Sequence, residues 1–194
     1  MIRAVIFDCF GVLVGKGFEN TYRLGGGDPV KDRAFIEDML GQANFGLVTD
    51  EDFRDAMAKQ LGLSKEQWRE VVSKAELPDL ELLAFIKWLR GQYKTAILSN
   101  ANTGVLDRKI GDELLKSCFD EVVVSADINL VKPDPRIYQL AAERLDVALN
   151  ECVFVDDNEG HLAPARELGM RTVLFRDSAQ AKAELEKILA NPES

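Results

Sequence analysis

Five short apolar segments, rich in β-branched residues, recur along the chain and predict strands. None of them alternates regularly between apolar and polar positions, as a strand with one solvated face would. Continuous hydrophobicity is typical of strands that are buried on both faces, in a parallel sheet covered by helices. The predicted strands cover residues 2–7, 95–98, 122–124, 153–155 and 172–175.

Helical periodicity separates these segments in the second half of the chain. Apolar residues recur there every three or four positions, as on the buried face of a helix. A chain that alternates strands and helices folds as an α/β domain with a parallel sheet. We therefore expect a Rossmann-like core with a central parallel sheet flanked by helices. The predicted helices cover residues 80–89, 136–145, 163–168 and 181–189.

Residues 15–78 break this alternation, because they lack a β-branched run. Three helical segments are predicted in their place, near residues 31–40, 51–61 and 65–75. We expect a small all-helical cap domain at 15–78, inserted after the first strand, and an α/β core domain made of 1–14 and 79–194. Lys16, Arg23 and the glycines at 25–27 are candidates for lining the cap entrance, but we expect a solvated loop there instead.

Polar residues stand where the predicted strands end. In doubly wound sheets, ligands bind at the carboxyl ends of the strands, so these side chains are expected to share one site. Clustered carboxylates repel one another unless a hard cation neutralises them, and Mg²⁺ prefers oxygen ligands of this kind. The residues in question are Asp8, Ser99, Asn100, Lys132, Asp156 and Asp157.

Asp8 is the candidate nucleophile of this site. With a metal ion and Lys132 screening the negative charge, a phosphate ester could approach Asp8 closely enough for in-line attack. The product would be an aspartyl phosphate, which water then hydrolyses. Ser99 and the backbone beside it would hold the phosphoryl oxygens. The site therefore predicts a magnesium-dependent phosphatase.

Four motifs in this order resemble motifs I to IV of the haloacid dehalogenase superfamily. The last segment, VDDNEGHLAPARELGM, is most similar to the phosphatase-like branch that includes the N-terminal domain of mammalian soluble epoxide hydrolase. The resemblance implies a Rossmann-like core and a small helical cap after the first strand. The motifs read FDCFGVL at 7–13, LSN at 98–100, KPDPRIY at 132–138 and VFVDDN at 153–158.

The resemblance also implies a role for each matching residue. It makes Asp8 the nucleophile, Lys132 the charge-neutralising lysine, and Ser99 with Asn100 the phosphate-binding pair. The implied ligands of Mg²⁺ are Asp8, the backbone carbonyl of Phe10, Asp157 and, directly or from the outer shell, Asp156.

Phe10 departs from the pattern of the superfamily. Most of its phosphatases carry a second aspartate two residues after the nucleophile, and that residue protonates the leaving group. A phenylalanine cannot transfer a proton, and general acid–base help contributes a factor of about 10² to 10⁴. We therefore predict slow turnover, a good leaving group or a substitute acid, for which His161 and Glu159 are the nearest candidates in the sequence.

Phe10 also keeps two other functions open. True haloacid dehalogenases have an aromatic residue at this position and displace halide without a metal. Their fourth motif, however, reads like Ser-Ser-Asn at the positions where this chain has Asp156, Asp157 and Asn158. Two acids would repel the carboxylate substrate of such an enzyme. The other alternative is a catalytically weak or inactive protein that keeps the fold for binding or regulation.

Composition and charge narrow the expected partners. The chain has 33 acidic and 24 basic residues, with a net charge of -9, which disfavours nucleic acid. No apolar stretch reaches the length of a membrane span or signal peptide, and three widely spaced cysteines indicate neither disulfides nor a zinc site. We expect a cytoplasmic monomer or homodimer that acts on a small phosphorylated metabolite.

Overall fold

A five-stranded parallel sheet forms the centre of the computed structural model, which describes residues 1–190. Its strand order is β3-β2-β1-β4-β5, and every neighbouring pair is parallel. Each of the five predicted segments overlaps a strand, so the predicted α/β fold class is confirmed. The strands are β1 (Ala4–Phe7), β2 (Lys94–Ser99), β3 (Glu121–Val124), β4 (Cys152–Asp156) and β5 (Arg171–Leu174).

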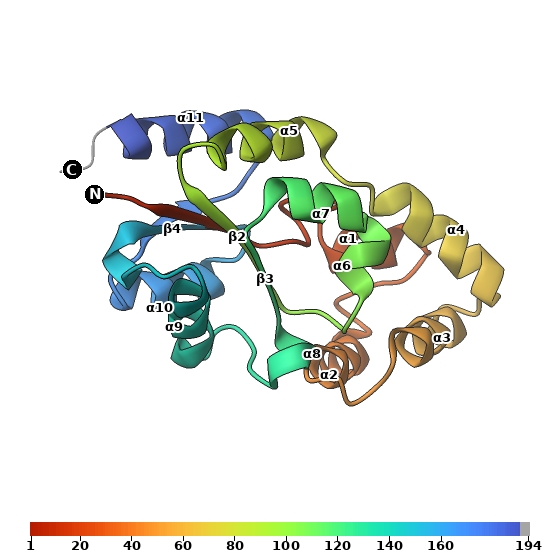
Figure 1. The fold of residues 1–194 in the computed structure, drawn as a ribbon. Helices are drawn as coiled ribbons and strands as arrows, with labels where there is room; N and C mark the ends of the chain where they lie inside the picture. The colour runs from red at the N-terminus through yellow and green to blue at the C-terminus, as the bar shows by residue number, and fades with distance from the viewer. Residues whose placement is uncertain (191–194) are drawn as a thin grey trace.

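Helices cover both faces of this sheet (Figure 1). Successive residues of β1 enter different hydrophobic clusters, with Val5 and Phe7 on one face and Ala4 and Ile6 on the other. Both faces are buried, which explains why the strand sequences show no polar alternation. One face carries α5 (Leu80–Leu89), α7 (Asp112–Cys118) and α11 (Ser178–Ala190), and the other carries α9 (Pro135–Arg144) and α10 (Glu159–Glu167).

Several short elements were not expected from periodicity. They are seven residues or shorter, so too few apolar positions repeat to reveal a helical period. No helix among residues 1–190 is long and apolar enough to cross a membrane. The unexpected elements are α1 (Phe18–Leu24), α6 (Val105–Lys109), α7, α8 (Ser125–Ile128) and the 3₁₀ helix η1 (Leu149–Glu151).

The segment after β1 forms a group of helices at the carboxyl ends of the strands, on the side of the molecule opposite both termini (Figure 1). Besides α1, it contains α2 (Arg33–Asn44), α3 (Asp50–Gln60) and α4 (Lys65–Ala75). Side chains close the N-termini of the last two, because Thr49 caps α3 and Ser64 forms a capping box on α4. This group, called the cap below, has its own hydrophobic cluster around Tyr22 and Trp68.

The two chain crossings between the cap and the sheet lie side by side. The Gly15 N–H donates to the Leu77 carbonyl at 3.0 Å, and the Asp79 N–H donates to the Leu13 carbonyl at 2.8 Å. The Asp79 side chain then accepts the Leu82 N–H at 2.8 Å and so begins α5. The division into domains at residues 15 and 78 stays a prediction.

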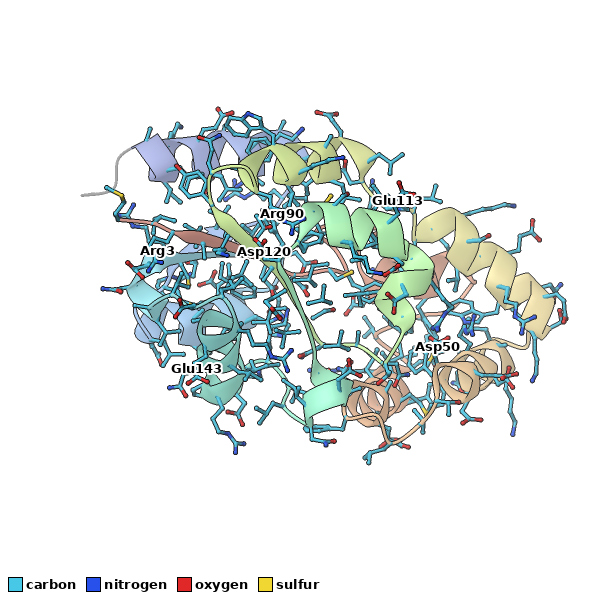
Figure 2. All side chains as sticks on the ribbon, in the orientation of Figure 1. Arg3, Asp50, Arg90, Glu113, Asp120 and Glu143 are labelled. Atoms are coloured by element: carbon cyan, nitrogen blue, oxygen red, sulfur yellow. The ribbon has the colours of Figure 1, made fainter. Side chains whose placement is uncertain are left out.

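Polar contacts hold the cap against the core. Asp50 lies at the start of α3 (Figure 2). Its carboxylate lies 2.7 Å from the guanidinium group of Arg54 and 2.6 Å from that of Arg108 on α6. The Ser125 hydroxyl of α8 donates to the carbonyl of Asn44 in α2 at 2.6 Å. These contacts fix the cap over the carboxyl ends of the strands.

Candidate active site

Asp8 lies directly after β1, the central strand of the sheet, at its carboxyl end. Its N–H donates to the Val155 carbonyl of β4 at 2.8 Å, so the backbone ladder continues through this residue. The side chain is almost fully buried, and its Oδ1 atom lies 2.8 Å from the ammonium group of Lys132. The predicted nucleophile is therefore fixed by a rigid strand and by a charged partner.

Lys132 places one positive charge between two carboxylates. Its fully buried Nζ atom lies 2.8 Å from Asp8 Oδ1 and 2.7 Å from Asp156 Oδ2. Burial lowers the pKa of this lysine, but the two carboxylates outweigh burial and raise it above the ordinary value. The ammonium group therefore stays charged, and the set of three groups carries one excess negative charge when both acids are ionised.

Asn100 holds the loop that carries Lys132. The Lys132 N–H donates to the Asn100 Oδ1 atom at 2.8 Å, and the Asn100 amide donates back to the Lys132 carbonyl at 2.9 Å. The side chain predicted to bind phosphate is thus engaged in positioning the lysine, although Asn100 also lines the main cavity. Ser99 is fully buried, is absent from the cavity lining, and its hydroxyl has no partner among residues 1–190.

The charge balance affects Asp8 directly. Burial raises the pKa of Asp8 to about 6, although the nearby Lys132 ammonium opposes this change and the Asp156 carboxylate adds to it. An acid that is destabilised in its ionised form gains from any further cation placed beside it. The site thus has the electrostatic character of a cation-binding site.

Asp156 lies behind Lys132 and is absent from the cavity lining. Its Oδ1 atom accepts the Asn158 N–H at 2.8 Å, and its Oδ2 atom binds Lys132. The Nδ1 atom of His161 lies 3.1 and 3.2 Å from the two carboxylate oxygens. Although ligand atoms of Asp8, Asp156 and His161 lie within 4.8 Å of one another, Lys132 already occupies the space between the two acids.

Asp157 faces the backbone of the loop that follows β1. A Cβ atom on Gly11 would lie 2.1 Å from Asp157 Oδ2, and Gly11 has a φ of 91°, so both the close approach and the backbone require glycine. Burial, and next the Asp156 charge, raise the pKa of Asp157. Asp8, Phe10 and Asp157 line the same cavity. Carboxylate and carbonyl oxygens, which these residues carry, are the donor types that a hard cation such as Mg²⁺ prefers.

The cavity has a volume of about 900 Å³ and continues from Asp8 into the cap. Lys16 and Arg23 are part of its lining, and Arg23 lies in α1, so the expected solvated loop is wrong for this residue. No signal in the sequence reveals these two positions, because their orientation depends on how the cap docks. Apolar lining residues from the cap are Phe18, Ile36, Leu40, Phe53, Trp68 and Val72.

His161 is the functional candidate whose surroundings the sequence described least. It lies in the first turn of α10. Its side chain is one-fifth exposed and lines the cavity. Glu159, the other candidate for a substitute acid, also lines the cavity but forms an ion pair with Arg166 at 2.9 Å. Of the two, His161 is the one that contacts the buried charge network.

Two curated proteins and one solved structure show what the chain resembles. It is 30% identical to bifunctional epoxide hydrolase 2 of Sus scrofa, over 96% of this chain and 39% of that relative, so the chain spans about two fifths of the relative's length. It is 26% identical to D-ribitol-5-phosphate phosphatase of Bacteroides thetaiotaomicron, over 97% of this chain and 99% of that relative.

The solved structure shares the fold. It is a HAD family enzyme of Bacteroides thetaiotaomicron in complex with magnesium and inorganic phosphate, with a TM-score of 0.73, 24% identity, and coverage of 91% of this chain and 95% of the other. The family model described as haloacid dehalogenase-like hydrolase matches residues 2–169. On this match, and on the sheet and the strand-end carboxylates described above, the chain belongs to the haloacid dehalogenase-like hydrolases.

Proposed function

We propose that this hydrolase is a phosphatase that cleaves small phosphate monoesters through an aspartyl phosphate on Asp8. One observation carries the proposal, namely a strand-end carboxylate that lines a large cavity and has one oxygen fixed 2.8 Å from a buried ammonium group. With Oδ1 held by Lys132, the other oxygen of Asp8 is the one available for attack. A nucleophile held in one orientation removes much of the entropic barrier of the reaction.

The reaction takes place in two steps. In the first, a bond forms between the Asp8 oxygen and phosphorus, the ester P–O bond breaks, and the leaving alkoxide takes up a proton. In the second, water attacks phosphorus and gives up a proton that replaces the one donated to the alkoxide, the acyl phosphate bond breaks, and inorganic phosphate leaves while the Asp8 carboxylate is restored. Lys132 stays protonated throughout and limits the repulsion between the incoming phosphate and the two buried acids.

The metal site of this proposal consists of oxygen donors around Asp8. Asp8, the backbone carbonyl of Phe10 and Asp157 would hold Mg²⁺, while Asp156 would act from behind by orienting Lys132. When bound, the ion would neutralise phosphoryl oxygens and align the ester for in-line attack. Support comes from the excess negative charge of the site and from the absence of sulfur or imidazole among these three donors.

The phosphoryl group would be held by the loop that follows β2. Among residues 1–190 the fully buried Ser99 hydroxyl has no partner, but Ser99 lies outside the cavity lining, so backbone N–H groups beside it would supply the contacts to phosphate. Because the Asn100 side chain is engaged with Lys132, the contribution of this residue to phosphate binding would come from its backbone. Both assignments are part of the proposal.

A substitute for the missing acid at Phe10 is the least conventional part of the site. His161 fits this role, because its Nδ1–H can donate a hydrogen bond to the Asp156 carboxylate, which orients the ring so that a protonated Nε2 would give its proton to the leaving group. Asn158 lies 3.5 Å from that Nε2 atom. The resemblance to a sugar-alcohol phosphate phosphatase supports a small phosphorylated metabolite as substrate.

Hydrolysis of para-nitrophenyl phosphate, measured with and without Mg²⁺, tests the proposal. We expect Mg²⁺-dependent phosphate release that the Asp8→Asn variant lacks and that the Asp112→Asn variant keeps, because Asp112 is an exposed residue of α7 paired with Lys116. Halide release from 2-chloropropionate without metal would instead establish a dehalogenase. Metal binding without turnover of any ester or haloacid would indicate a binding protein.

A further inference from the structure

The part of the cavity wall formed by the cap and by α6 carries more positive than negative charge, although the whole protein has a net charge of -9. Two of its arginines, Arg54 and Arg108, share a single acid, Asp50. Lys16 forms no ion pair among residues 1–190. The other basic residues of this wall form one-to-one ion pairs, which are Arg23 with Glu19, Arg33 with Glu37 and Lys109 with Glu76.

Asp50 lies between the guanidinium groups of Arg54 and Arg108, called the arginine pair below. Its Oδ2 atom is 2.7 Å from Arg54 and 2.6 Å from Arg108. Neither contact is aligned as a hydrogen bond, since this buried atom has no hydrogen-bond partner among residues 1–190. Charge therefore holds the three groups together. Because guanidinium groups stay ionised in proteins, the set has one excess positive charge when Asp50 is ionised.

Both members of the arginine pair are accessible from the cavity. Their side chains are 32% and 46% exposed, and both line the cavity. A guanidinium group has five N–H donors, but Arg54 donates one hydrogen bond, to the Asp50 carbonyl, and Arg108 donates one, to the Gly104 carbonyl. The remaining donors have no aligned acceptor among residues 1–190, so a ligand in the cavity can use them.

The arginine pair lies across the junction of cap and core. Arg54 belongs to α3 of the cap, whereas Arg108 belongs to α6, which follows the loop after β2. Asn100 and Val105 of this segment line the same cavity, so the segment connects the catalytic groups with Arg108 along the wall. A ligand that extends through the cavity can therefore contact Asp8 with one end and the arginine pair with the other.

We propose that Arg54 and Arg108 form an anion subsite, which selects substrates whose leaving group carries its own carboxylate or second phosphate. The inference rests on the proposed phosphatase function and specifies the substrate class, a small phosphate monoester with a second anionic group remote from the phosphoryl group. Guanidinium groups bind carboxylate and phosphate oxygens through paired hydrogen bonds. The one-to-one ion pairs of the wall have no excess charge, and Lys16 is a single exposed charge on a flexible stem.

Calorimetry with non-hydrolysable phosphonates in the presence of Mg²⁺ tests this subsite. At each of several chain lengths, an ω-carboxyalkyl phosphonate is compared with its ω-carboxamide counterpart, which has the same shape without the charge. At the best length we expect the carboxylate to bind about tenfold more tightly, near the lower end for a hydrogen bond to a charged group. An α,ω-bisphosphonate that binds more tightly than the carboxylate would identify the second anion as a phosphate, and a weaker one would identify it as a carboxylate.

Two variants should shift this ratio of affinities in opposite directions. In Arg108→Gln, Asp50 neutralises the remaining Arg54, so the ratio should fall to about one. The affinity for inorganic phosphate should stay unchanged, because inorganic phosphate needs only the sheet end of the cavity. In Asp50→Asn, both arginines lose their acid, so the ratio should rise above that of the unchanged protein. This rise does not depend on whether Arg108→Gln keeps the cap in place.

Arg33→Gln is the matched control. It removes the same charge from the same cavity wall, but Arg33 forms a one-to-one ion pair with Glu37 on α2 at 2.7 Å, so this variant should keep the tenfold ratio. Lys16→Met removes the other excess charge of the wall and should keep the ratio as well.

A ratio of one at every chain length in the unchanged protein would overturn the inference. A ratio that survives in Arg108→Gln, or that falls equally in Arg33→Gln or Lys16→Met, would also overturn it, because the preference would then come from the general charge of the wall. The proposed function can fail separately, since binding is measured without turnover. If the ratio behaves as expected while no phosphate ester is hydrolysed, the subsite stands and the phosphatase proposal falls.

Discussion

The two ends of the cavity differ in how their charged groups are held. At the sheet end, buried charges pair with one another, since Lys132 binds Asp8 and Asp156, and Asp156 also binds His161. At the cap end, the lining mixes apolar side chains with exposed charged pairs, such as Arg23 with Glu19. Ion pairs that are shielded from water are held far more firmly than exposed ones. The sheet end is therefore the more rigidly organised of the two.

The largest effect is expected from removing the Lys132 charge at the sheet end of the cavity. Lys132→Met would leave two buried carboxylates facing each other without a cation, which costs about 3 to 5 kcal/mol of unfolding free energy, and would also abolish phosphate release. Urea unfolding and a phosphate assay measure the two losses. Because Asp156 is one of the two acids left without a cation, the double variant Lys132→Met, Asp156→Asn should regain part of the stability but no activity. Unchanged stability in the single variant would contradict the charge network described above.

A smaller effect is expected at His161. If the imidazole replaces the acid missing at Phe10, His161→Asn should slow hydrolysis of an alkyl phosphate by about 10²-fold, the lower range of general acid catalysis. Para-nitrophenyl phosphate should be affected much less, because its leaving group needs no proton. Initial rates for both esters provide the comparison, with Glu159→Gln as the control that keeps both rates. Equal losses on the two esters would reduce His161 to a residue that only positions Asp156.

A still smaller effect is expected from weakening the ion pairs of Asp50, which join the cap to the core. Asp50→Asn would weaken the ion pairs from α3 to Arg54 and Arg108, and partly exposed pairs of this kind contribute about 1 kcal/mol or less. We expect a small drop in the urea midpoint and unchanged kcat, because no group at the sheet end is touched. Glu70→Gln, which removes an ion pair on the cap surface, is the control. A large loss of kcat would show that cap position and chemistry are coupled.

The smallest effect concerns pH and the junction between the two regions. Burial of Asp79 acts to raise its pKa, but hydrogen bonds from Ser178 and from backbone N–H groups of α5 outweigh burial and lower it below the ordinary 3.8. A lowered folded-state pKa stabilises the protein above the unfolded-state value, and this stabilisation is lost as the pH falls through the folded-state value. The stability difference between the unchanged protein and Asp79→Asn should therefore shrink from pH 6 to acid pH, as urea titrations would show. A constant difference would contradict the lowered pKa.

The sheet and its long helices follow from local patterns. Continuous apolar runs such as Val153 to Val155 identified strands buried on both faces. The helical period of apolar residues over 80–89 predicted the first and the last residue of α5 correctly. Short helices such as α6 and α8 escaped, because one turn carries no measurable period. At the site, strand-end placement brought Asp8, Lys132 and Asp157 to one cavity.

What the sequence by itself determined is the set of groups at the carboxyl ends of the strands, since parallel pairing brings these ends to one edge regardless of packing details. Only the tertiary structure decided how they divide their tasks. It paired Asp156 with Lys132 and His161, engaged the Asn100 side chain with the lysine loop, and placed Arg23 in the cavity lining. The physical reason is that hydrogen-bond partners and burial depend on contacts between segments far apart in the chain, such as α4 against α1, and no local period of apolar and polar residues encodes them.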